Sequence, residues 1–212
     1  MKNLDNTHMQ DFYDFSSCNY LTTFYASSVR CLEFIKQSEF EKIRQFDKAL
    51  KWGDYSNEDI SFPVVFKEQR ESGKKMRDIL DNRGVANYLI SDRFRDALEK
   101  EGITGWKCYP VEIYDKKGNL VHGYNGFSVT GRAGKMQKHD IPPVELGYDP
   151  ESYGCYFEYD SWDGSDIFNT ENSNYLIVTE RFIEVIRKYK ITACHFARLT
   201  EYGSLRKQST IR

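Results

Sequence analysis

A stretch with nearly the same order of apolar and polar residues occurs twice along the chain. The phrase NYLISDRF begins at Asn87, and NYLIVTERF begins at Asn174 with one extra residue, Val178. Each copy opens with a short apolar run that is typical of a buried strand. Apolar residues then recur at helical spacing and form one stripe in each copy: Phe94, Ala97 and Leu98 in the first, and Phe182, Val185 and Ile186 in the second.

The boundaries of the two predicted helices are marked by capping residues. Ser91 and Thr179 precede the helices, and a hydroxyl at this position can accept a bond from a free backbone N–H group. Gly102 is suited to end the first helix, whereas Lys190 at the matching position of the second ends it less sharply. At the following turn, Ala193 stands where the first copy has a glycine.

Both copies therefore predict a strand, a helix and a second strand, at 85–114 and at 174–202. Internal duplication of a folding unit explains each matched position, with both stripes packed on a shared mixed sheet. The alternative is that the two helices form a pseudo-symmetric binding surface.

Other segments have patterns of their own. We expect a helix near 38–51, a strand at 61–68 and a short helix at 73–84. Residues 111–129 predict a β-hairpin that turns at 116–119, and residues 131–150 predict a loop.

The predicted fold class is α+β, with two internally repeated strand-helix-strand units, a β-hairpin and a helical N-terminal region. We expect residues 1–60 to form that helical region, packed on a main domain at 61–204, and residues 205–212 to form a flexible tail.

Composition favours a protein of the cytoplasm. The N-terminus has no basic start followed by an apolar run, and no apolar stretch approaches the length that crosses a membrane. The five cysteines are scattered without a C-x-x-C pair, so neither a disulfide framework nor a zinc site is expected.

Charge is distributed unevenly, although the net charge is only −2. The segment 140–180 contains no lysine or arginine and ten acidic residues. The rest of the chain holds all 30 basic residues and 22 acidic ones, a formal charge of +8. Such separation creates a local field that affects association with charged partners.

Motifs for catalysis are weak. The adjacent His139 and Asp140 could be half of an acid–base pair, which keeps a small enzyme or ligand-binding protein as the alternative function. The segment 130–135, TGRAGK, lacks the spacing of a phosphate-binding loop, and no nucleic-acid motif occurs. We therefore expect no catalytic residues, no cofactor or metal and no nucleic acid as partner.

The basic-free segment also carries a group of aromatic residues. Tyrosine and tryptophan anchor protein interfaces, and acidic residues around them select and steer a basic partner. The predicted partner-binding residues lie near its middle: Glu158, Tyr159, Asp160, Trp162, Asp163 and Asp166. The alternative is that the acids are merely a solvated face; for Trp162 the two interpretations stand about even, whereas the phenylalanines nearby are expected in the core.

The doubled pattern resembles a known family. Residues 73–119, from GKKMRDIL to YDKKGN, and residues 165–199, from SDIFNTEN to CHFARL, are similar to the type-eleven immunity proteins of bacterial polymorphic toxin systems. The resemblance covers roughly residues 60–200. It implies a cytoplasmic protein that binds and neutralises a cognate toxin, with no catalytic residues to carry over. A basic toxin, such as a nuclease, would match the acidic segment.

Overall fold

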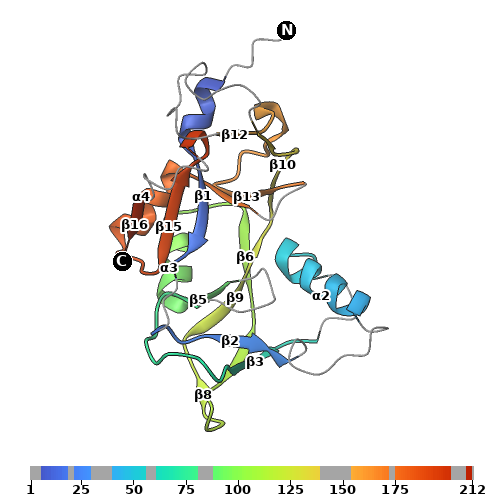
Figure 1. The fold of residues 1–212 in the computed structure, drawn as a ribbon, viewed down its shortest axis with the longest axis vertical. Helices are drawn as coiled ribbons and strands as arrows, with labels where there is room; N and C mark the ends of the chain where they lie inside the picture. The colour runs from blue at the N-terminus through green and yellow to red at the C-terminus, as the bar shows by residue number, and fades with distance from the viewer. Residues whose placement is uncertain are drawn as a thin grey trace.

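The protein is a mixed α+β structure in which strands predominate (Figure 1). This computed structural model describes residues 6–18, 22–29, 40–55, 61–80, 88–138, 154–171, 175–201 and 209–211. Within these ranges there are three α-helices: α2 (Phe40–Trp52), α3 (Asp92–Lys100) and α4 (Glu180–Lys188). The α+β character is thus confirmed.

The largest sheet has six strands in the order β10-β13-β14-β1-β15-β16. Its strand β1 (Phe12–Ser17) runs antiparallel to both neighbours, although these come from the other end of the chain. The other members are β10 (Gly131–Ala133), β13 (Ile167–Thr170), β14 (Leu176–Thr179), β15 (Cys194–Arg198) and β16 (Ser209–Ile211).

Two four-stranded sheets complete the scaffold, with orders β4-β5-β9-β6 and β2-β3-β7-β8. The first contains β4 (Ile79–Leu80), β5 (Leu89–Ser91), β9 (Tyr124–Val129) and β6 (Trp106–Tyr109). The second contains β2 (Ala26–Ser28), β3 (Val64–Glu68), β7 (Val111–Tyr114) and β8 (Leu120–Val121). A short pair joins β11 (Gln137–Lys138) to β12 (Cys155–Tyr156).

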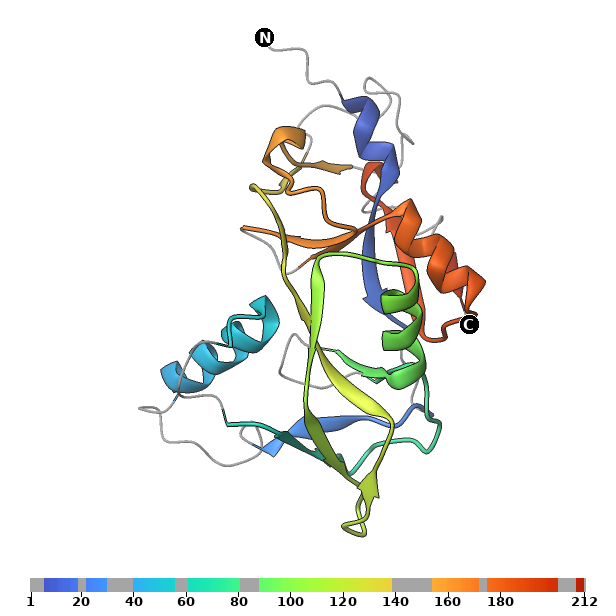
Figure 2. The same cartoon turned by 180° about the vertical axis from the view of Figure 1, so that it is seen from behind.

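The two similar sequence stretches do not share one sheet, which corrects that part of the predicted fold. The elements β5, α3 and β6 belong to a four-stranded sheet, while β14, α4 and β15 belong to the six-stranded one. In each sheet a strand from elsewhere in the chain, β9 or β1, lies between the two outer strands of the unit. The helices α3 and α4 contact each other, as Figure 2 shows.

Both apolar stripes enter one core because the two helices face each other. The predicted stripe residues of both helices are all buried, together with Phe15 of β1 and Phe127 of β9. Large apolar side chains removed from water contribute on the order of 2 kcal/mol each to folding. This shared core makes the two units one packed body.

Helix capping follows the sequence in one unit and departs from it in the other. Ser91 Oγ accepts a bond from Phe94 N at 3.1 Å, as predicted. Thr179 makes no cap bond, although its hydroxyl donates to Asp166 Oδ1 at 3.1 Å as that of Ser91 donates to Asp78 Oδ1 at 2.8 Å. Lys190 adopts φ +52°, close to the +62° of Gly102, so both helices end in the same left-handed turn.

Several other predictions need correction. The N-terminal region is not only helical: α2 lies close to the predicted span, but β1 forms the middle of the large sheet. Residues 79–80 form strand β4 rather than part of a helix, since they pair with β5. In the predicted tail, residues 209–211 pair with β15. The predicted hairpin at 111–129 forms only between β7 and β8, because β9 pairs with β5 and β6 in another sheet.

Candidate functional site

The acidic aromatic segment forms a short 3-10 helix, η4 (Tyr159–Ser161), at the end of the molecule that also carries the N-terminal 3-10 helix η1 (Asn6–Asp11) (Figure 1). Ser161 Oγ donates to Glu158 O at 2.5 Å and accepts from Gly134 N at 2.8 Å. These bonds fix the turn to the strand edge beside it. A side chain on this turn is therefore presented from a rigid support.

Asp163 holds the segment against the outer edge of β10. Its carboxylate accepts from Arg132 N at 2.7 Å and Ser165 N at 3.0 Å, and its own backbone N–H donates to Arg132 O at 3.0 Å. A free strand edge offers unpaired groups to other chains, and here the loop occupies them. Asp163 is exposed, but it has a structural role.

Trp162 is partly buried and packs against the core cluster. Its ring meets Phe12 edge-on at 5.0 Å and lies 5.7 Å from Phe168, and its indole N–H donates to Ser165 O at 3.0 Å. Phe157 packs into the same cluster. The expectation that the phenylalanines are core residues is confirmed, and Trp162 packs against them while remaining partly exposed.

Asp166 is buried, at 7% exposure, and lies inside the molecule. Its Oδ2 accepts from Thr104 N at 3.0 Å, Thr104 Oγ1 at 3.1 Å and Arg181 Nη1 at 2.7 Å. A carboxylate satisfied by so many donors stabilises the fold and has no free oxygen to offer a partner. Asp166 is therefore removed from the predicted binding surface.

The remaining predicted residues, Glu158, Tyr159 and Asp160, are exposed side by side. Tyr159 is 40% exposed, which is high for a large apolar side chain. In the described part of the chain, neither Glu158 nor Asp160 forms an ion pair. We call these three residues the η4 surface.

His8 extends this surface and was missed by the sequence analysis. Its ring stacks on Tyr159 with centroids 4.5 Å apart and an interplanar angle of 26°. The stacking fixes the orientation of the tyrosine while leaving its outer edge in water. No local sequence pattern predicts this contact, because His8 and Tyr159 are far apart in the sequence and meet only in the folded protein.

The described residues offer little for covalent or metal chemistry. Burial raises the pKa of the Cys155 thiol to about 11 and that of Cys108 to about 12, so both thiols are protonated at neutral pH. In the parts of the chain that the structure describes, no three His, Cys, Asp or Glu side chains gather into a potential metal site. The predicted pair His139 and Asp140 lies outside the described residues.

One carboxylate elsewhere is unusual. Asp14 lies in the middle of β1, and burial raises the pKa of its carboxyl to about 6. Among the described residues it has no hydrogen-bond donor or cation as a partner. A desolvated carboxyl without a partner weakens the fold when it ionises.

Comparison with known proteins adds no relative. No family model matches the chain, and no curated protein matches it. None of the described helices is long and apolar enough to cross a membrane.

Proposed function

We propose that this chain is a non-enzymatic binding protein that neutralises a toxin by direct contact, as the resemblance to the type-eleven immunity proteins implies. The observation that carries the proposal is the η4 surface: an exposed tyrosine between two carboxylates that have no ion-pair partner among the described residues. A partly apolar ring supplies contact area, and unpaired acids attract a basic partner and orient it.

The structure changes which residues the proposal uses. Glu158, Tyr159 and Asp160 are the proposed contact residues. Trp162, Asp163 and Asp166 support them from within, through the core, the strand edge and the bonds to Thr104. The proposed partner is a basic toxin domain, and the proposed site of action is the cytoplasm.

We also propose that the two strand-helix-strand units descend from one duplicated unit. The support is the equivalence of their contacts: Arg93 donates to the backbone oxygens of Tyr189 and Lys190, and Arg181 donates to those of Glu101 and Gly102. Each arginine stands at the same place in its own helix and closes the end of the other. Reciprocal contacts of this kind are those of a two-fold symmetric pair.

Co-expression tests the proposed function. If a large secreted protein with a C-terminal toxin domain is encoded beside this chain, that domain is the probe. Cells that produce the domain should survive when the wild-type chain is present and die when it carries Glu158→Lys and Asp160→Lys. A matched control, Glu99→Lys with Glu184→Lys, changes the charge equally on exposed helix positions and should still protect. Death of cells that also produce the wild-type chain would refute neutralisation.

A further inference from the structure

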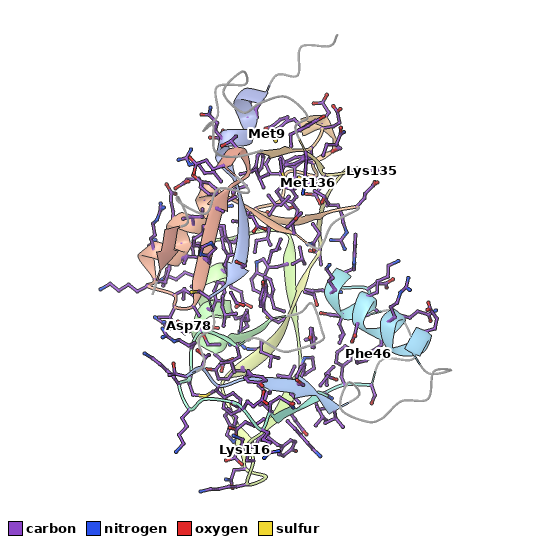
Figure 3. The ribbon with its side chains drawn as sticks, viewed as in Figure 1. Met9, Phe46, Asp78, Lys116, Lys135 and Met136 are labelled. Carbon is purple, nitrogen blue, oxygen red and sulfur yellow. The ribbon has the colours of Figure 1, made fainter. Side chains whose placement is uncertain are left out.

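A second candidate site lies at the opposite end of the molecule, on the outer face of the sheet that contains β3 and β7. A pocket of about 390 Å³ opens there and is lined by Val65, Lys67, Tyr114, Asp115, Lys116 and Gly118. Figure 3 shows Lys116 at this end, far from Met9 and Met136 of the core cluster beneath the η4 surface. The pocket volume is within the range of roughly 300–1,000 Å³ that small-molecule sites occupy.

The floor of the pocket is flat and fixed. Val65 and Lys67 of β3 alternate with buried residues, and Lys67 lies directly beside Tyr114 of β7 in the parallel register. The Tyr114 hydroxyl donates to Glu112 Oε2 at 2.8 Å, which holds the ring in one orientation. Tyr114 and Val65 thus offer an apolar, partly aromatic surface.

The carboxylates around the pocket are already engaged. Asp115 accepts from Lys117 N and Asn119 N, both at 2.8 Å, and from Asn119 Nδ2 at 2.9 Å, which lowers the pKa of its carboxyl. Glu68 accepts from Lys116 N at 2.9 Å and pairs with its ammonium group at 3.3 Å. These bonds also make the hairpin turn rigid.

Lys67 is different, because in the described part of the chain its ammonium group has no carboxylate and no hydrogen-bond acceptor. An ammonium group beside an aromatic ring, with Glu68 paired to Lys116 and Asp115 bonded within its own turn, selects an anionic group attached to a flat apolar one. We propose that this pocket binds a small molecule that carries a phosphate or carboxylate next to a planar ring. This inference does not depend on the η4 surface.

Amide chemical shifts measured by NMR on the full chain test the proposal. The probes are adenosine 5′-monophosphate and benzoate, each with its neutral counterpart, adenosine and benzamide. At least one anionic probe should shift the amides of Lys67, Tyr114 and Gly118 saturably and bind about five- to tenfold more tightly than its neutral counterpart, because only the anion engages Lys67. Comparing the two anions distinguishes a phosphate from a carboxylate site.

A lysine variant identifies the group responsible. Lys67→Gln should weaken binding of the anionic probe about five- to tenfold, whereas Lys48→Gln, the same change at an exposed position of α2, should not. Three results would overturn the proposal: no saturable shift with either anion, equal affinity for charged and neutral probes, or equal loss in both lysine variants.

Discussion

The carboxylate of Asp78 accepts hydrogen bonds from the backbone N–H and the hydroxyl of Thr192, both at 2.8 Å, although 114 positions separate the two residues. The same relationship holds in the opposite direction between Asp166 and Thr104. Each aspartate precedes one unit in the chain and bonds to the turn of the other. The two contacts, which we call the Asp–Thr clasps, join the two units to each other.

We predict that Asp78→Asn destabilises the protein by about 2 to 4 kcal/mol. The substitution places an amide donor among the groups that now donate to the carboxylate, including Ser91 and Arg93, and leaves buried donors without acceptors. Urea unfolding measures the effect. Asp96→Asn, at a carboxylate with 62% side-chain exposure, is the control and should stay within about 0.5 kcal/mol of the wild type.

The same variant has a pH signature. Burial alone raises the pKa of Asp78, but hydrogen bonds from Arg93, Thr192 and Ser91 outweigh it and hold the pKa below its usual value. The stabilisation is therefore complete above the ordinary carboxyl pKa and is lost as the pH falls through the lowered one. A stability difference between wild type and Asp78→Asn that grew on acidification would contradict this account.

Asp14→Asn should have the opposite effect. Because burial raises the folded-state pKa of Asp14 to about 6, its protonated form favours folding below an unfolded value near 3.8, and this contribution is lost as the pH rises through 6. The variant should therefore exceed the wild type by up to about 3 kcal/mol at pH 8, and the gain should vanish near pH 4. Urea unfolding between pH 4 and pH 8 measures this difference in unfolding free energy. A difference that did not change with pH would exclude ionisation of Asp14 as its cause.

Local sequence rules predict the helices well because their signals lie within a few residues. The stripes of α3 and α4 and the cap at Ser91 all follow from spacing alone. Thr179 has the same local signal, and its hydroxyl donates to Asp166 as that of Ser91 donates to Asp78, yet only Ser91 caps its helix. A hydroxyl can donate to a carboxylate and accept a cap bond at once, so the bond to Asp166 does not explain the missing cap.

Long-range pairing could not be predicted in the same way. Strand β1 pairs with β14 and β15, which lie more than 150 residues away in the sequence. The residues of β1 carry no signal that predicts which strands it pairs with. Within the acidic segment, the sequence identifies Glu158, Tyr159 and Asp160 as readily as Trp162 and Asp166. Only the fold distinguishes them, since Trp162 packs against Phe12 and Asp166 is buried and bonded to Thr104.

Lys190→Gly should stabilise the protein by about 0.5 to 1 kcal/mol. Lys190 adopts φ +52° at the end of α4, where glycine avoids the steric cost that a side chain carries in this conformation. Thermal and urea unfolding provide the measurement. Glycine at Glu184, an exposed position inside the same helix, should instead cost about 1 kcal/mol. If both glycines destabilise equally, the left-handed turn confers no advantage.

Trp162 and Tyr159 should respond differently to alanine. Trp162→Ala removes a ring packed on Phe12 and Phe168 and should cost about 3 kcal/mol or more in unfolding free energy. Tyr159→Ala removes a ring that is 40% exposed and should cost about 1 kcal/mol, mainly through its stacking with His8. An equal loss in the two variants would assign both rings to the core and remove Tyr159 from the proposed surface.

The central claim is that the η4 surface binds a basic toxin domain, and calorimetric titration of purified wild-type and variant chains with that domain tests it most directly. Glu158→Lys with Asp160→Lys should weaken binding about tenfold or more while leaving the urea midpoint unchanged, because both side chains are exposed and unpaired among the described residues. The control pair, Glu99→Lys with Glu184→Lys, should bind almost like the wild type. Wild-type affinity in the first double variant, or an equal loss in the control, would contradict the claim.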